Sequence, residues 1–352
     1  MDITKIDKNF KEESITAQDS RTFRLPCEPF SLYGGWYEKG YGFLKMPVET
    51  AQKISEGVAW GSRCTAGVRL LFSTDSSFIK LTAKLWQKCL MTHMPITGSA
   101  SFSLVEVATN EEKLVGLFRP TFDQEQTFTS QCTLQGKGMR NYILYFPLYS
   151  GVEDLEIELE QGCKVQAYEK YKAVKPVLYY GSSITQGGCA SRGDNCYQAF
   201  VGEWLNADYL ILGFSGSAKA EPKMIDYLAN VDCSVFVCDY DHNAPSVEHL
   251  QNTHLKLYQA FRNAPKHKNT PILFLSKPDG HRDGMGEERF KIIERTYQYA
   301  KEKGDSNVYL LDGREFYPKR IREHCAVDGC HPNDLGFYFM AEKVYGVIKD
   351  LL

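Results

Sequence analysis

The chemistry that this chain could carry begins with a serine placed directly after a short apolar segment. Pro176 precedes the run Val177-Leu178-Tyr179-Tyr180, and Gly181-Ser182-Ser183 follows it. An apolar run bounded by proline and a Gly-Ser turn is typical of a buried strand that ends in a tight loop. Open α/β sheets bind ligands at the carboxyl ends of such strands, so the hydroxyl of Ser183 stands where a reacting group would be useful.

A histidine and an aspartate far downstream complete a catalytic pattern. Asp328 precedes His331 by three residues on a loop rich in Gly, Pro and Asn, so its carboxylate can turn back and orient the imidazole. The three side chains would supply a nucleophile, a general base and an orienting carboxylate. Taken alone, Ser183 could cap a helix or bind a phosphate, but the GxGxxG and GxxxxGK[ST] patterns are missing. The combination favours a hydrolase.

Four separated blocks, in the right order, resemble the SGNH (GDSL-type) hydrolase superfamily. They are residues 181–185, 213–216, 239–243 and 328–331. Two features depart from the usual pattern. Ser182 stands where an aspartate is usual, and the third block lacks its Gly-x-Asn-Asp form, so that His242 competes with Asn243 for the role of that block. The resemblance covers roughly the second half of the chain.

The resemblance implies a set of roles for these residues. Ser183, Asp328 and His331 would be the catalytic triad. The backbone N–H groups of Ser183 and Gly216 and the side-chain amide of Asn243 would form the oxyanion hole. The superfamily chemistry needs no cofactor, and we expect no metal, because the spacing of the nearby cysteines does not fit a zinc template.

Composition narrows the possible partners and compartments. The chain has 352 residues and a net charge of −3, which argues against nucleic acid or an anionic membrane as the main partner. No apolar stretch approaches the roughly 20 residues that span a bilayer. Residues 1–7 show no apolar signal-peptide core. Eleven scattered cysteines indicate reduced thiols, so we expect a cytoplasmic protein. The sequence does not indicate the oligomeric state.

The first part of the chain shows the period of β-strands. Ile79, Leu81, Ala83 and Leu85 alternate with polar residues, as in an antiparallel strand with one buried face. No amphipathic helix of normal length is visible between residues 23 and 167. We therefore expect a β-sandwich or jelly roll over residues 1–170. Trp60, beside a glycine, could stack on a sugar over the site, although filling the sandwich core is the simpler interpretation.

After Pro176 the pattern changes to alternating strands and helices. Strands are predicted near residues 177–180, 209–212, 233–238, 271–275 and 307–311, with helices between them and a last helix over 334–350. This alternation predicts a parallel sheet with right-handed crossovers, and hence a flavodoxin-like three-layer sandwich over residues 171–352. Each block then follows a strand, so all of them meet at one edge of the sheet. The polar loop 277–284, with His281, should border that edge and could touch substrate, although a solvated loop is the simpler interpretation.

The pairing of a β-domain with an SGNH domain resembles carbohydrate esterases that remove O-acetyl groups from glycans. Since no lid-like apolar helix lies near the blocks, a small acyl group fits better than a long chain. The resemblance implies acetylated manno- or xylo-oligosaccharides as substrates. Three alternatives remain. The serine could transfer its acyl group to an alcohol, the substrate could be a short-chain ester that is not a sugar, or the protein could bind carbohydrate without catalysis.

Overall fold

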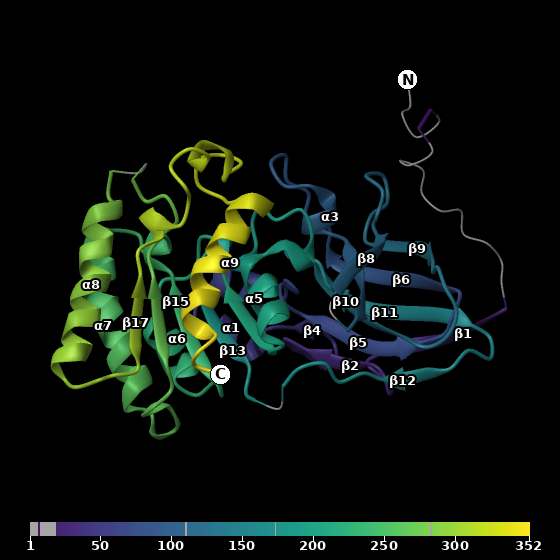
Figure 1. Ribbon diagram of the computed structural model, residues 1–352, viewed down its shortest axis with the longest axis horizontal. Helices are drawn as coiled ribbons and strands as arrows, with labels where there is room; N and C mark the ends of the chain where they lie inside the picture. Colours follow the sequence, from purple (N-terminus) through teal and green to yellow (C-terminus); the bar gives the residue numbers. More distant parts are fainter. Residues whose placement is uncertain (1–5, 8–18, 110, 173, 282–283) are drawn as a thin grey trace.

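Two antiparallel sheets form the first half of the molecule (Figure 1). The computed structural model describes residues 6–7, 19–109, 111–172, 174–281 and 284–352, so most of the segment used to judge the signal peptide lies outside it. One sheet contains β1 (Ser20–Leu25), β3 (Trp36–Glu38), β4 (Gly42–Leu44), β6 (Phe78–Gln87), β9 (Thr127–Thr133) and β11 (Gly151–Glu160). The other contains β2 (Ser31–Tyr33), β5 (Arg69–Thr74), β7 (Phe102–Ala108), β8 (Glu111–Phe118), β10 (Arg140–Tyr145) and β12 (Val165–Ala167).

The alternating pattern of β6 explains how these sheets pack. Ile79, Leu81, Ala83 and Leu85 are all fully buried, and they join a core with Leu70 and Phe72 of the opposite sheet. The predicted β-sandwich is therefore confirmed. Three short helices, α1 (Val48–Gln52), α2 (Glu56–Ser62) and α3 (Ile96–Ser99), interrupt it. They were not predicted, because a helix of four to seven residues is too short to show a period.

The second half contains a five-stranded parallel sheet. Its strands are β13 (Val177–Gly181), β14 (Tyr209–Gly213), β15 (Val235–Asp239), β16 (Ile272–Leu275) and β17 (Val308–Leu311), in the spatial order β14-β13-β15-β16-β17. This order confirms the predicted flavodoxin-like fold. The order reverses at β13, which pairs with β14 on one side and β15 on the other. The crevice at such a switch point is where ligands bind in open α/β sheets.

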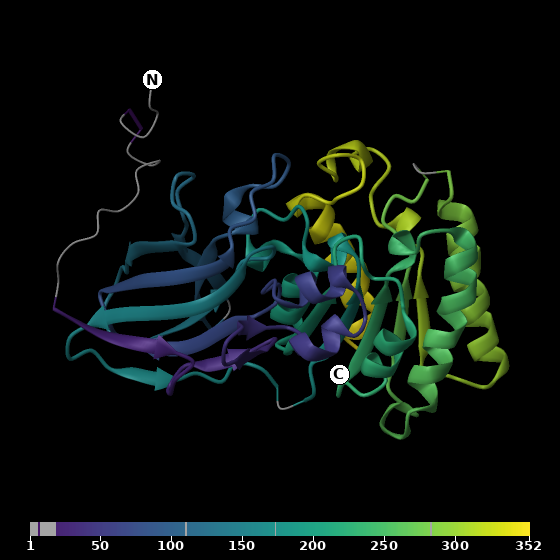
Figure 2. The same cartoon turned by 180° about the vertical axis from the view of Figure 1, so that it is seen from behind.

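Helices cover both faces of the parallel sheet (Figures 1 and 2). Val177 and Tyr179 of β13 pack with residues of α5 (Tyr197–Leu205) and α9 (Asp334–Ile348). Leu178 and Tyr180 pack with residues of α6 (Pro222–Leu228), α7 (Val247–Asn263) and α8 (Gly286–Glu302). Ser246 caps α7, since its Oγ accepts from the N–H of His249 at 3.0 Å.

The antiparallel and parallel parts share a hydrophobic core. Leu71 and Ile143 of the β-sandwich belong to the same buried cluster as Tyr179 and Ile211 of the parallel sheet. Every residue of β5 is buried, because one of its faces covers the sandwich core and the other covers this shared cluster. All eleven cysteines lie within the described residues and are free thiols. No helix of the described residues is long and apolar enough to cross a membrane.

Candidate active site

Ser183 lies where β13 turns into a single helical turn, α4 (Ser183–Gln186). Ser182 caps this turn, because its Oγ accepts from the N–H of Ile184 at 3.1 Å. Gly187, with a φ of +99°, ends the turn in a left-handed conformation that favours glycine. As the first residue of a helix, Ser183 has a backbone N–H with no partner within that helix. Its hydroxyl lies 2.9 Å from Nε2 of His331.

His331 is held by the loop that precedes α9. The backbone N–H of Val327 donates to the carbonyl of His331 at 2.9 Å and closes the loop on itself. Gly329, with a φ of +80°, makes the turn between Asp328 and His331. Nδ1 of His331 lies 2.7 Å from Oδ2 of Asp328. A carboxylate can only accept here, so the ring proton sits on Nδ1 and Nε2 is left to accept from the Ser183 hydroxyl.

Asp328 is held in its charged form. Partial burial raises the pKa of its carboxyl, but hydrogen bonds from the backbone and ring of His331 and from the N–H of Cys330 outweigh burial and lower the pKa to about 2. The two backbone bonds reach Oδ1 at 2.8 Å from His331 and 2.9 Å from Cys330. A carboxylate fixed by two amides can orient the imidazole and stabilise its positive charge.

Two further groups lie at the same cavity as Ser183, each after the end of a neighbouring strand. Gly216 follows β14 and has a φ of +66° with open space where a Cβ would lie, so its conformation and not crowding demands glycine. Asn243 ends the short 3₁₀ helix η4 (Asp241–Asn243) after β15. Its Oδ1 accepts from the N–H of Ala218 at 3.3 Å, which turns the NH₂ end of the amide the other way. The predicted oxyanion donors therefore border the same cavity as Ser183.

This cavity has a volume of about 400 Å³. Its lining residues come from both ends of the chain's second half: Ser183, Ser215, Gly216, His242, Asn243, Lys277, Met285, Arg289, Cys330 and His331. His242 also lines this cavity. Trp60 and His281 are not among its lining residues. The indole N–H of Trp60 donates instead to Oε1 of Gln87 at 2.9 Å, and His281 is exposed beside residues 282–283, which lie outside the described part of the chain.

Comparison with known proteins identifies the family of this chain. The model of the GDSL-like lipase/acylhydrolase family matches residues 174–349, which is half of the chain. The chain belongs to this GDSL-like family. A second family model, the N-terminus of SGNH-hydrolase-type esterases, matches residues 28–165. A search of curated proteins found no match.

Solved structures share the two-part architecture. A GDSL-like lipase from Bacteroides ovatus has a TM-score of 0.83 at 23% identity and covers 94% of this chain and 98% of its own. The salicylyl-acyltransferase SsfX3 from a tetracycline biosynthetic pathway has a TM-score of 0.78 at 17% identity, covering 95% and 99%. A family two carbohydrate esterase from Clostridium thermocellum has a TM-score of 0.59 at 15% identity, covering 82% and 93%. At these sequence identities, the structural similarity shows that the proteins share a fold.

In this GDSL-like chain an arginine that the sequence analysis missed holds the third block in place. Arg289 of α8 is buried, and its guanidinium donates to the carbonyl of Asp241 and, at 3.1 Å, to the carbonyl of Ala244. These two carbonyls flank His242 and Asn243. The sequence carries no motif for this role, since an arginine on an amphipathic helix is normally interpreted as a solvated residue.

Ser182, which stands where an aspartate is usual, has a hydrogen-bond partner in the third block. Its Oγ lies 2.5 Å from Nε2 of His242, whose Nδ1 lies 3.0 Å from Oδ1 of Asp241. Burial raises the pKa of Asp241, but hydrogen bonds from His242 and from the N–H of Lys277 outweigh it and lower the pKa. Both ring nitrogens of His242 therefore have hydrogen bonds, which fix the orientation of the ring beside the oxyanion donors.

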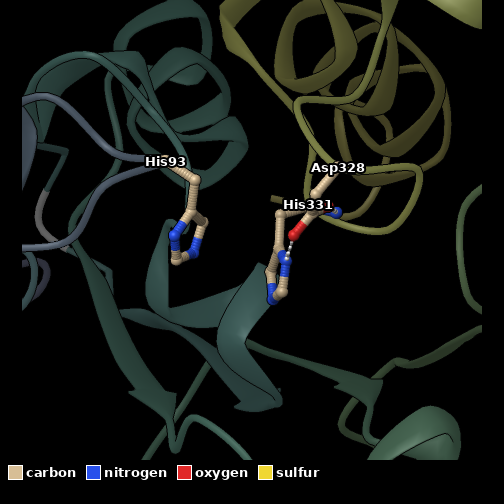
Figure 3. Close-up of side chains that lie close together, drawn as sticks. All are labelled: His93, Asp328 and His331. Carbon is tan, nitrogen blue, oxygen red and sulfur yellow. Dashed lines mark hydrogen bonds and ion pairs between the residues drawn. The ribbon is translucent and has the colours of Figure 1, made fainter.

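The β-sandwich also reaches this edge. His93 lies on the loop before α3, and its ring centroid is 6.0 Å from that of His331 (Figure 3). His93, Asp328 and His331 are close enough to hold a metal ion, as are Asp239, Asp241 and His242. In both groups, however, the histidine beside the aspartate already has hydrogen bonds at both ring nitrogens. Hydrogen bonds within the protein are therefore enough to explain why the side chains of each group lie close together.

A buried lysine of the β-sandwich supports the second block. Nζ of Lys45 is fully buried and donates to the carbonyl of Gly213 at 2.6 Å. Burial lowers the pKa of this lysine to about 8. Gly61 of α2 lies so close that a Cβ there would be 2.9 Å from the ring of Phe214. The β-sandwich therefore packs directly against the segment that presents Gly216.

Proposed function

We propose that the protein is a serine esterase that removes small acyl groups, O-acetyl groups foremost, from oligosaccharides such as manno- or xylo-oligosaccharides. The observation that carries the proposal is the hydrogen-bonded chain from Ser183 through His331 to Asp328, with Gly216 and Asn243 bordering the same cavity. The cavity of about 400 Å³ has room for a small acyl group. The carbohydrate esterase from Clostridium thermocellum, whose structure contains cellohexaose, supports a sugar substrate.

The chemistry follows from the geometry. Ser183 Oγ attacks the ester carbonyl while Nε2 of His331 takes its proton. The carbonyl oxygen becomes an oxyanion that accepts from the N–H groups of Ser183 and Gly216 and from the amide of Asn243. Each such donor typically contributes about 10²–10³ in rate. The oxyanion then collapses, and His331 returns the proton to the departing alcohol. Water attacks the acyl-serine with His331 again as base, which releases the acid and restores Ser183.

The proposal is tested by mass spectrometry of acetylated manno- and xylo-oligosaccharides incubated with the enzyme. We expect loss of acetyl units with the native protein and with Ser306→Ala, an exposed control serine, but not with Ser183→Ala. Equal loss with Ser183→Ala would overturn the serine mechanism. Cleavage of a small aryl acetate without loss of any sugar acetyl group would keep the mechanism and overturn the sugar substrate.

Acyl transfer to an alcohol is the second candidate, because the same acyl-serine can react with an alcohol in place of water. The fold that the chain shares with the salicylyl-acyltransferase supports this alternative. Adding increasing amounts of an acceptor sugar to the reaction distinguishes the two. A transferase forms a new ester at the expense of free acid, whereas an esterase releases the same amount of acid throughout.

A further inference from the structure

An apolar groove lies beside the catalytic loop, on the side of the β-sandwich. It has a volume of about 530 Å³ and is lined by the loop before α3, including Leu90, His93 and Met94, together with Phe122 and Val327. We call it the apolar groove. Phe122 is 78% exposed, and Leu90 and Val327 are each 46% exposed. Exposed apolar side chains gathered in one hollow mark a binding site.

The apolar groove lies next to the candidate active site, although the two hollows share no lining residue. Val327 precedes Asp328, and its N–H donates to the carbonyl of His331. His93 lines the groove, and its ring lies beside that of His331, with 6.0 Å between the two centroids (Figure 3). The cavity that contains Gly216 and Asn243 extends instead toward Lys277 and Met285. His331 therefore lines the cavity that contains the oxyanion donors and lies next to His93, which lines the apolar groove.

The proton path decides which part of an ester would lie in the groove. His331 must deliver its proton to the departing oxygen, so the alcohol lies on the side of His331. The carbonyl oxygen must face Ser183, Gly216 and Asn243, on the other side. We propose that the apolar groove is the subsite for the departing alcohol and binds the apolar face of a ring carried by that alcohol. This inference rests on the proposed esterase chemistry.

The lining indicates a ring face rather than a fully polar chain. Phe122, Leu90 and Val327 offer exposed apolar surface, and His93 brings a polar ring close to His331. An aromatic ring stacks well on the C–H face of a pyranose or on another ring, and bulky apolar side chains favour the same flat partner. A sugar ring and an aryl ring share this chemistry, and the experiment separates them.

The test compares esters with one acyl group and different alcohols. Cyclohexyl acetate and ethyl acetate form the same acetyl-enzyme, so their ratio of kcat/KM reports only how the alcohol is bound during acylation. We expect Phe122→Ala to lower this ratio about tenfold and Leu90→Ala to lower it by a smaller factor. Leu114→Ala, an exposed leucine on β8 of the same sandwich, is the matched control and should leave the ratio unchanged. An unchanged ratio in both groove variants would overturn the proposal.

A second series keeps the alcohol and varies the acyl group. The preference for acetate over butyrate should be the same in Phe122→Ala and in the native protein. A changed acyl preference with an unchanged alcohol preference would assign the groove to the acyl chain and overturn the proposal.

Two ring alcohols separate this inference from the proposed function. For phenyl acetate and for a mono-O-acetyl methyl mannopyranoside, kcat/KM is measured and divided by the value for ethyl acetate. If the native protein cleaves the aryl ester but no sugar ester, while Phe122→Ala lowers the ratio for cyclohexyl acetate, the sugar substrate fails and the groove stands. If sugar esters are cleaved equally well by the native protein and by Phe122→Ala, the proposed function stands and the groove fails.

Discussion

At the scale of single residues, Asp328 has the most sharply defined environment. Two backbone amides bind Oδ1 and the imidazole binds Oδ2. In Asp328→Asn the side-chain amide would no longer fix the proton on Nδ1 of His331, and the ring would present the wrong tautomer to Ser183. We expect kcat on a small aryl acetate to fall about 10³–10⁴-fold. Asp350→Asn, at an exposed site, should keep full activity.

The same carboxylate makes stability depend on pH. The pKa of Asp328 is about 2 in the folded protein, against an ordinary value of 3.8, so the folded state binds this proton less readily than the unfolded state. Its contribution is therefore present above about pH 4 and is lost as the pH falls toward 2. The Tm of Asp328→Asn should lie below that of the native protein at pH 6, and the gap should narrow below about pH 4. A gap that is constant with pH would contradict this.

The sequence predicted which residues meet at the site only where a motif carried the signal. Ser183 and His331 were found because a strand-turn pattern and an Asp-x-x-His spacing each carry a chemical reason. His93 was missed because a lone histidine in a β-rich segment has no motif, and its proximity to His331 depends on how the two halves pack. Arg289 was missed because its role is to bind backbone carbonyls, which sequence does not display.

At the scale of elements, α8 and η4 together set the position of Asn243. Arg289 binds the carbonyls on both sides of the His242-Asn243 pair. A lysine is a point charge and cannot reach both carbonyls as the planar guanidinium does. We expect Arg289→Lys to lower kcat by about 10–100-fold with little change in KM, because a displaced Asn243 stabilises the oxyanion less well.

A double-mutant cycle separates this positioning role from a general loss of fold. Asn243→Ala alone should cost about 10²–10³ in kcat. If Arg289 acts through Asn243, Arg289→Lys should cost much less in the Asn243→Ala background than in the native protein. Independent, additive losses would show that Arg289 acts elsewhere. Arg295→Lys, at an exposed position of the same helix, is the matched control.

At the scale of the whole molecule, Arg69 joins the two halves. It is fully buried on β5, and its guanidinium donates to Oδ1 of Asp208 and to the hydroxyl of Tyr171, each at 2.6 Å. Arg69→Met would leave Asp208 without its cation. We expect a loss of about 3 kcal/mol in the free energy of unfolding by urea. Arg24→Met removes an exposed ion pair with Glu156 and should cost less than about 1 kcal/mol. Equal losses of unfolding free energy in the two variants would contradict the role of Arg69 in connecting the two halves.

The sequence alone did not predict this contact between the two halves. Arg69 interrupts the apolar run Val68-Arg69-Leu70-Leu71-Phe72, and in a strand with one solvated face an arginine would point to water. The structure buries it because the second face of β5 is covered by the parallel domain. Each half could be predicted from its own period, whereas their contact depends on residues far apart in the chain.

This shared core also determines how the protein should unfold. Leu71 and Ile143 of the sandwich pack in one cluster with Tyr179 and Ile211 of the parallel sheet. If either half opened alone, it would leave the apolar side of the other in water and the buried Arg69 ion pair broken. We therefore expect a single calorimetric transition in which the calorimetric and van't Hoff enthalpies agree. Two separate transitions would show that the halves are energetically independent. The apolar groove and the triad would then be held together only by local contacts around His93 and Val327.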